Sequence, residues 1–241
     1  MQVRIFKDSQ AVAKAAAMIF AAQLAEKSDS VLGLATGSTP IETYQNMIQL
    51  YKEGQMDFSQ VKSYNLDEYV GLKPEHECSY RYFMQTQLFD HINIRPENTF
   101  VPSGVAEDLE ETGRAYDQAV RAAGGVDLQL LGIGNNGHIG FNEPDDHFTS
   151  GTHVVDLTES TIKANTRFFA SEDEVPRKAI SMGVGTIMSA RKVLLLALGQ
   201  AKAQAVRDTV KGEITPRVPA SVLQLHSNAI ILLDEAAASL L

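Results

Sequence analysis

Short apolar runs alternate with amphipathic segments along the whole chain. Runs rich in Val, Leu and Ile are typical of buried strands, and apolar residues that recur every three or four positions predict helices. We expect strands at residues 3–6, 31–35, 61–66, 127–133, 193–198 and 229–233. We expect helices from Val12 to about Lys27, from Ile41 to a stop at Gly54, from Leu109 to Gly124, and from about Ala201 to Lys211.

This alternation predicts an α/β fold with a mostly parallel sheet and helices on both of its faces. The 241 residues are enough for one large domain that spans residues 1–241. No repeat, low-complexity tract or linker interrupts the pattern. Residues 150–176 are polar and only weakly periodic, so we expect a lid segment there.

Composition and charge narrow the function classes. The formal net charge is −9 with no basic cluster, so we expect no nucleic acid and no anionic membrane as partner, although a local basic pocket could hold a small anion. Cys78 is the only cysteine, which excludes an intramolecular disulfide. Neither a signal peptide nor an apolar run of about 18 residues is present. We therefore expect a cytoplasmic protein.

The most informative stretch is LLGIGNNGHIGFNEP at residues 130–144. Its apolar strand runs into glycines, which let the backbone approach a ligand closely. Gly132, Gly134 and Gly137 also satisfy G-x-G-x-x-G, but a dinucleotide site needs a helix that opens at the last glycine. A further glycine and Pro144 interrupt the segment where that helix would lie. The alternative to a ligand site is a glycine-rich turn with a surface histidine and glutamate.

Ligands bind beyond the carboxyl ends of the strands in open parallel sheets, so the junctions after strands are candidate sites. The junction TGSTP at residues 36–40 offers hydroxyl and N–H groups at a helix start, which is typical of a phosphate cradle. No Gly-Lys-Ser/Thr follows, so we expect no nucleoside triphosphate. Ser38 or Thr39 could instead only cap the helix. Lys202 follows Gly199 at another helix start, where a cation is disfavoured unless it faces a bound anion.

Three more residues carry candidate chemistry. Asp67 ends an apolar strand, where a partly dehydrated carboxylate can act as a base on a carbon acid, although a capping or turn role also fits. His138 and Glu143 lie five positions apart across a glycine turn, near enough for the carboxylate to orient the imidazole. They lack a third ligand at a recognisable spacing, so we expect no metal. No G-x-S-x-G motif supports a serine hydrolase.

Four motifs in collinear order resemble the glucosamine-6-phosphate deaminase family, and the resemblance covers almost the whole chain. They are LATGSTP at 34–40, NLDEYVGL at 65–72, GIGNNGHIGFNEP at 132–144 and LQLH at 223–226. The resemblance implies a modified Rossmann-like three-layer sandwich, shared with ribose-5-phosphate isomerase and coenzyme A transferases. It also implies an enzyme of amino sugar catabolism that converts glucosamine 6-phosphate and water into fructose 6-phosphate and ammonia, without a cofactor.

The resemblance also implies roles for single residues. Asp67 matches the base that moves a proton from C2 towards C1, and His138 matches the group that opens the pyranose ring, with Glu143 as its partner. Asn136 stands where some members carry an aspartate that supports this histidine. An amide can hydrogen-bond the imidazole but cannot stabilise imidazolium by charge, so ring opening would rest more heavily on Glu143. The residues that match the phosphate site are Thr36, Gly37, Ser38, Thr39, Arg167 and Lys202.

Two other functions compete with this interpretation. A 6-phosphogluconolactonase would share the fold and bind a phosphorylated six-carbon ligand, but it needs no base at C2, which the NLDEY motif supplies. A sugar-phosphate-sensing domain of a transcription regulator would lose the catalytic groups and carry a DNA-binding segment. This chain keeps Asp67, His138 and Glu143, and its sequence begins directly with a predicted strand.

The resemblance also bears on regulation. Longer members of the family resemble one another in being hexamers activated by N-acetylglucosamine 6-phosphate, which is held by basic residues after the N-E-P motif and by a tyrosine in a C-terminal extension. The corresponding stretch here has Asp146, His153, Val155 and Asp156, and the sequence stops at Leu241. These side chains are unsuited to a phosphate. We expect a non-allosteric monomer or small homo-oligomer with hyperbolic kinetics.

Overall fold

The main sheet of the protein is entirely parallel. The computed structural model describes residues 1–241. Every neighbouring pair in its seven-stranded sheet is parallel, and the strand order is β1-β10-β9-β6-β2-β3-β5. The strands are β1 (Gln2–Phe6), β2 (Val31–Leu34), β3 (Lys62–Asn65), β5 (Thr99–Phe100), β6 (Leu128–Leu131), β9 (Lys192–Ala197) and β10 (Ala229–Asp234).

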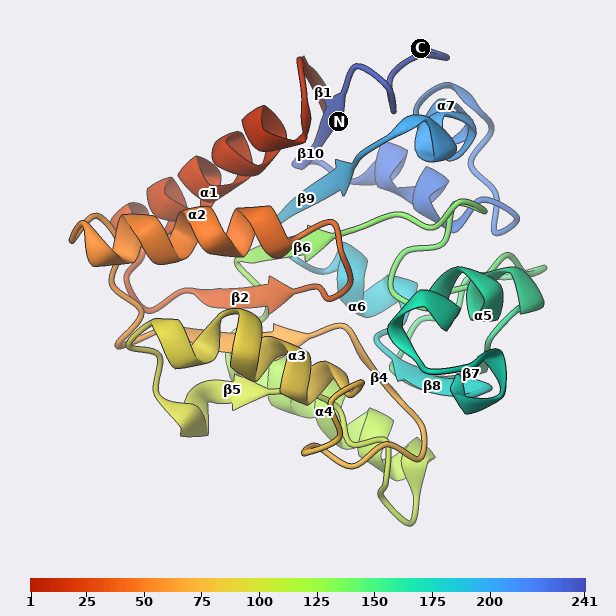
Figure 1. The fold of residues 1–241 in the computed structure, drawn as a ribbon, viewed down its shortest axis with the longest axis horizontal. Helices are drawn as coiled ribbons and strands as arrows, with labels where there is room; N and C mark the ends of the chain where they lie inside the picture. Colours follow the sequence, from red (N-terminus) through yellow and green to blue (C-terminus); the bar gives the residue numbers. More distant parts are fainter.

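Helices cover both faces of this sheet: α1, α2 and α3 lie in front of it and α4 and α6 behind it in Figure 1. Central strands such as β2 and β6 are buried along their whole length, as expected for apolar runs enclosed by two helical layers. The α-helices are α1 (Ser9–Glu26), α2 (Ile41–Lys52), α3 (Tyr80–Gln87), α4 (Leu109–Ala122), α5 (Glu159–Asn165), α6 (Val184–Met188) and α7 (Ala203–Lys211). None of them combines the length and the apolar character needed to cross a membrane.

Short 3₁₀ segments complete the helical layers. They are η1 (Phe89–His91), η2 (Pro96–Asn98), η3 (Thr166–Phe168), η4 (Glu172–Glu174), η5 (Gln200–Lys202) and η6 (Pro219–Leu225). One continuous apolar core includes side chains from the sheet and from both layers, such as Phe20 on α1, Leu130 on β6 and Val120 on α4. The predicted α/β Rossmann-like fold is confirmed.

The strand order places the candidate junctions beside one another. From β2 the chain proceeds outward to β3 and β5, whereas from β6 it proceeds outward in the other direction to β9, β10 and, by pairing, β1. A ligand crevice is expected where the order reverses, which here is between β2 and β6. The four junctions singled out in the sequence follow the neighbouring strands β9, β6, β2 and β3. Their carboxyl ends therefore meet at one edge of the sheet.

A second, antiparallel sheet was not predicted. It consists of β4 (Asp67–Tyr69), β8 (Lys178–Ser181) and β7 (His153–Asp156), and it lies with α5 beyond the carboxyl ends of the main strands in Figure 1. The segment expected as a lid, residues 150–176, contains β7, α5, η3 and η4. Its mixed polar and apolar sequence reflects short elements of which only one face is covered. Its role as a lid stays a prediction.

Two predicted boundaries were wrong. Asp67 does not end a strand of the main sheet, because β3 stops at Asn65 and Asp67 opens β4, where it pairs with Ser181. The apolar run continues through both strands because Leu66 between them is also buried. The helix expected from Ala201 begins as the 3₁₀ turn η5, and α7 starts only at Ala203.

Candidate functional site

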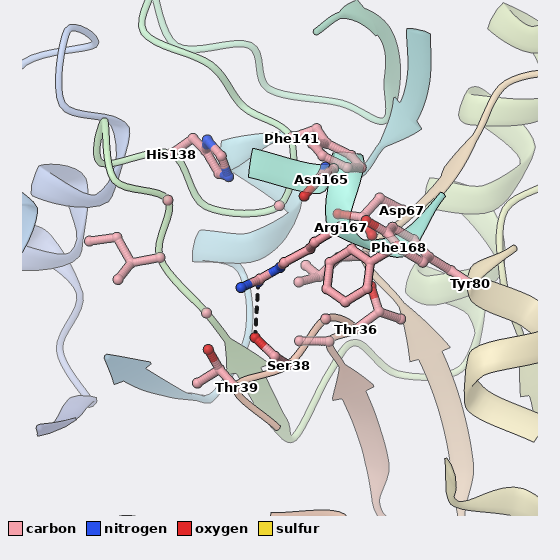
Figure 2. Close-up of a pocket in the computed structure, with 17 residues that line it drawn as sticks. Thr36, Ser38, Thr39, Asp67, Tyr80, His138, Phe141, Asn165, Arg167 and Phe168 are labelled. Carbon is pink, nitrogen blue, oxygen red and sulfur yellow. Dashed lines mark hydrogen bonds between the residues drawn. The ribbon is translucent and has the colours of Figure 1, made fainter. Parts of the chain in front are cut away.

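A pocket at the carboxyl edge of the sheet brings together most of the predicted site residues. Figure 2 shows its walls, which come from the loop after β2, the start of β4, the glycine-rich loop after β6 and the segment around η3. We call it the main pocket. Its lining residues are Ala35, Thr36, Gly37, Ser38, Thr39, Leu66, Asp67, Tyr80, Gly132, Ile133, Gly134, His138, Gly140, Phe141, Asn165, Arg167 and Phe168.

The predicted phosphate cradle forms one wall of the main pocket. Gly37 has a φ of 90°, a conformation that only glycine adopts without strain. Helix α2 is capped at Pro40 without any side-chain hydrogen bond. The alternative that Ser38 or Thr39 serves only as a helix cap is therefore wrong, because neither hydroxyl makes that contact. The hydroxyl of Ser38 instead accepts a hydrogen bond from Arg167 Nη2 at 3.1 Å.

Arg167 faces this cradle, Lys202 lies near Arg167, and neither cation has an acidic partner. Arg167 extends from η3 across the pocket to Ser38, as Figure 2 shows, and its guanidinium lies over the Phe168 ring at 4.7 Å. Lys202 lines a smaller side pocket that it shares with Arg167 and His138. Neither cation forms a salt bridge in this structure.

The pKa of the Lys202 ammonium is unusually low for a lysine. Burial lowers its pKa to about 8, and the neighbouring Arg167 charge lowers it in the same direction. Two adjacent cations without a carboxylate, in a chain with a net charge of −9, repel one another. A bound anion would remove this repulsion, so the arrangement is typical of a phosphate site.

Asp67 is the bare carboxylate of the main pocket. Its residue is only 6% exposed, yet its side chain accepts no hydrogen bond from any protein group. Burial, together with the adjacent Glu68 charge, raises its pKa to about 8. A carboxylate with this pKa near the physiological range can both remove and return a proton.

Glu68 points into a different environment from Asp67. Its carboxylate accepts hydrogen bonds from the backbone N–H groups of Tyr69, Tyr80 and Arg81 at 2.8–3.0 Å. Burial raises its pKa, and these three N–H groups act in the opposite direction. Glu68 thereby ties β4 to the first turn of α3, which places the Tyr80 ring in the wall of the main pocket.

His138 lies against the glycine-rich loop. The Gly134 N–H donates to the His138 carbonyl at 2.9 Å and closes the turn. A Cβ on Gly134 would come within 2.4 Å of the His138 Cε1 and Nδ1 atoms, so a side chain there is incompatible with the position of this ring. No helix begins at Gly137, and none occurs before α5. The dinucleotide alternative is therefore excluded, because its pyrophosphate site needs that helix.

Glu143 supports His138 from behind the pocket. Its Oε2 lies 3.4 Å from His138 Nδ1, an ion-pair distance with an alignment too poor for a hydrogen bond. Although burial acts to raise the pKa of Glu143, the imidazole and the hydrogen bonds from Thr161 and Asn136 lower it to about 2. Glu143 is thus an anion held next to the ring. Its side chain lines the cavity on the far side of the loop and does not line the main pocket.

Asn136 acts on Glu143 and not on the imidazole. Its Nδ2 donates to Glu143 Oε2 at 2.6 Å, and its Oδ1 accepts from the His138 backbone N–H at 3.2 Å. The amide makes no hydrogen bond to the imidazole, whose Nδ1 lies towards Glu143. The amide instead fixes both the carboxylate and the loop.

Several residues of the site gave no recognisable signal in the sequence. Tyr80, Phe141 and Asn165 line the main pocket, and the rings of Tyr80 and Phe141 stack at 6.0 Å. Asn165 donates to the Tyr69 hydroxyl at 2.9 Å and joins the segment around η3 to β4. Asn165 and Phe141 had usable neighbours in the sequence, since Asn165 lies two positions before Arg167 and Phe141 lies between His138 and Glu143. Tyr80 reaches the pocket through contacts between distant parts of the chain.

Comparison with known proteins identifies the family. The sequence profile described as glucosamine-6-phosphate isomerases/6-phosphogluconolactonase matches residues 7–232. The chain belongs to this family. A relative named glucosamine-6-phosphate deaminase, from Thermoanaerobacter sp. (strain X514), is 55% identical over 241 residues, covering 100% of this chain and 95% of that protein.

Solved structures of this family agree with the fold. A structure described as a monomeric glucosamine-6-phosphate deaminase matches with a TM-score of 0.98 at 47% identity and covers 100% of both chains. A 6-phosphogluconolactonase from Thermotoga maritima matches with a TM-score of 0.77 at 16% identity, covering 97% of this chain and 99% of that one. At that identity the likeness shows the shared fold alone.

Proposed function

We propose that the chain converts glucosamine 6-phosphate and water into fructose 6-phosphate and ammonia. The observation that carries the proposal is the bare carboxylate of Asp67, which shares one pocket with His138 and with a cradle faced by an unpaired cation. Relatives that cover the whole chain at more than half identity carry the name of this activity. Both the site and the relatives therefore favour the deaminase over the other functions.

The phosphate of the substrate would bind between the β2 loop and the two cations. Thr36 to Thr39 offer hydroxyls and backbone N–H groups, and Arg167 and Lys202 supply the positive charge. The phosphate would take over the contact that Arg167 now makes with Ser38. Anchoring one end of the sugar in this way holds C1 and C2 near Asp67 and His138, so that binding energy is used for orientation.

Ring opening requires a proton to leave the C1 hydroxyl and another to reach the ring oxygen. The imidazole of His138 can accept the first proton and donate the second, and the C1–O5 bond breaks as the aldehyde forms. The imidazolium that exists between these transfers lies 3.4 Å from the Glu143 carboxylate. Because Glu143 remains ionised, with a pKa of about 2, it stabilises the imidazolium by charge.

Asp67 then moves the proton from C2 to C1. It removes the C2 proton while the C1 oxygen takes up a proton from the substrate ammonium, which gives an enolamine, and it then returns the proton to C1, which leaves a protonated imine at C2. Water adds to this imine, the C–N bond breaks, and ammonia leaves as the ketone of fructose 6-phosphate forms. The pKa of about 8 suits Asp67 to both halves of the transfer. Aromatic walls such as Tyr80 and Phe141 limit water around the enolamine.

We also propose that the enzyme is a monomer or small homo-oligomer that acts in the cytoplasm. The structure described as a monomeric deaminase supports the first part. The presence of Cys78 as the only cysteine accords with a reducing compartment. The proposal includes neither nucleic acid nor membrane as a partner, because no basic cluster offsets the charge of −9.

A two-product assay tests the proposed activity. The purified protein is incubated with glucosamine 6-phosphate, and ammonia and fructose 6-phosphate are measured together. We expect equal amounts of both products. Glucosamine without its phosphate is the matched substrate control and should react very poorly, because the anchoring energy is missing. Hydrolysis of 6-phosphogluconolactone without ammonia release would favour the lactonase, and absence of any turnover would favour the sensing domain.

A further inference from the structure

Each oxygen of the Glu143 carboxylate contacts a different part of the chain. Oε2 accepts a hydrogen bond from Asn136 Nδ2 at 2.6 Å and lies 3.4 Å from His138 Nδ1. Oε1 accepts hydrogen bonds from the hydroxyls of Thr161 and Thr158. The carboxylate therefore connects the glycine-rich loop that carries the imidazole to helix α5 of the predicted lid.

Thr161 is the principal link on the lid side. Its residue is only 5% exposed, and the neighbouring Ile162 packs with Tyr69 and Phe141 in a small apolar cluster that fixes the orientation of α5. The Thr158 hydroxyl is 3.3 Å from Glu143 and also 3.1 Å from the Thr161 hydroxyl. Since a hydroxyl has one proton, Thr158 cannot donate to both. The closer hydroxyl of Thr161 makes the charge-assisted bond.

The same segment reaches the phosphate side of the pocket. Asn165 at the end of α5 donates to the Tyr69 hydroxyl, and Arg167 two positions later donates to Ser38. About one and a half helical turns therefore separate Arg167, which would bind the phosphate, from Thr161, whose hydroxyl bonds to Glu143. A movement of this segment changes both contacts together.

We propose that Thr161 is a positioning residue that couples phosphate binding to ring opening. The inference rests on the proposed function and deepens it. In the structure Thr161 already occupies Glu143 Oε1 while Arg167 contacts Ser38, and a phosphate bound by Arg167 would hold the segment in this position. Oε2 then faces Asn136 and His138, which aligns the imidazole with the ring oxygen of the sugar. Thr161 touches no reacting atom and acts only through Glu143.

Thr161→Val tests this coupling because it removes the hydroxyl and keeps the branched shape. We expect turnover of glucosamine 6-phosphate to fall on the order of 10- to 100-fold, the effect of losing a hydrogen bond to a charged group, with KM nearly unchanged. Thr161→Ser restores the hydroxyl and should recover most of the turnover. Thr161→Ala is the second hydroxyl-free variant, in case valine prevents folding.

The decisive measurement uses a substrate that needs no pyranose opening. An analogue without the 4- and 5-hydroxyls, 2-amino-2,4,5-trideoxyhexose 6-phosphate, can form neither a furanose nor a pyranose and still presents C1, C2 and the phosphate. Thr161→Val should process it at nearly the rate of the unmodified enzyme. The matched control is Thr166→Val, whose hydroxyl bonds only the Ile162 carbonyl within the same segment and which should leave both rates unchanged.

Other outcomes overturn the proposal. Equal loss on both substrates would assign Thr161 a purely structural role, and full activity of Thr161→Val on the pyranose would remove any role. If the unmodified enzyme releases neither ammonia nor fructose 6-phosphate from glucosamine 6-phosphate, the proposed function itself fails and this inference fails with it. An active unmodified enzyme whose variant shows no difference between the two substrates refutes the coupling alone.

Discussion

The imidazole of His138 rests on the backbone of Gly134, where a Cβ would come within 2.4 Å of the ring atoms Cε1 and Nδ1. The turn that creates this contact is closed by the Gly134 N–H bond to the His138 carbonyl. The second glycine of the G-x-G-x-x-G pattern is therefore explained by the approach of a side chain from its own loop. A residue larger than glycine at this position has to displace the ring.

Gly134→Ala should displace the imidazole and slow ring opening. We expect turnover of glucosamine 6-phosphate to fall about 100-fold, since a shift of about 1 Å in a catalytic group costs this much. Circular dichroism should show a folded protein, because the clash involves a movable ring. The variant should still process the analogue that cannot form a pyranose. A turnover equal to that of the unmodified enzyme would contradict the position of the ring.

Asp67→Asn should separate catalysis from stability. Loss of the base should lower turnover by about 10²- to 10⁴-fold with binding retained. The raised pKa of Asp67 favours the fold below the ordinary pKa and destabilises it as pH rises through about 8. The variant should therefore have a higher Tm than the unmodified protein at pH 9, measured by thermal denaturation. Near-normal turnover would refute the assignment of the base.

Glu68→Gln should shift the acidic limb of the pH profile. The base must be ionised, so kcat/KM is expected to rise with pH through the Asp67 pKa of about 8. The Glu68 charge is the second cause of that raised pKa, after burial. Its removal should move the acidic limb to lower pH, while the Gln oxygen can still accept from the Tyr80 N–H and only the Arg81 N–H loses its acceptor. A limb that stays in place, or moves to higher pH, would contradict this electrostatic coupling.

The charge of Lys202 should control the basic limb of the pH profile of kcat/KM. Its pKa of about 8 means that the ammonium loses its charge above that pH, so phosphate binding weakens and kcat/KM falls. Lys202→Arg keeps the charge at all working pH values and should move the basic limb to higher pH. Lys202→Met should raise KM about 10-fold or more at pH 7 with a smaller effect on kcat. Unchanged KM in the methionine variant would place the phosphate elsewhere.

The polar side chains after the N-E-P motif are already paired with other groups of the chain, so we expect no activating sugar phosphate to bind there. Asp156 pairs with Lys178 at 3.5 Å, Asp146 pairs with Arg217, and His153 Nδ1 contacts the Gly151 carbonyl at 3.0 Å. Burial also lowers the pKa of His153, which disfavours its cationic form. We therefore expect hyperbolic kinetics, no response to N-acetylglucosamine 6-phosphate, and a monomer or dimer by light scattering. A hexamer with sigmoidal kinetics that this compound makes hyperbolic would refute the expectation.

The apolar pattern by itself determined the parallel sheet. The largely apolar runs VLGL, LQLL and VLLLA form β2, β6 and most of β9, because strands enclosed by helices on both faces are mainly apolar. The residues that follow these strands were recognisable as candidate site residues too. Glycines, a lysine and hydroxyl residues at a strand end are seldom needed for the fold alone. The position of Asp67 and His138 in one pocket follows from this pattern together with the fold, because both follow strands of the main sheet.

Only the tertiary structure decided what those residues contact. The strands β4, β7 and β8 exist through antiparallel pairing of segments distant in sequence, and each is too short and too mixed in character to produce a periodic signal. Tyr80 enters the pocket because Glu68 holds the start of α3. Thr161 contacts Glu143 although 17 residues separate the two in the sequence. Such hydrogen bonds depend on distances between side chains in space, and spacing along the chain carries no information about them.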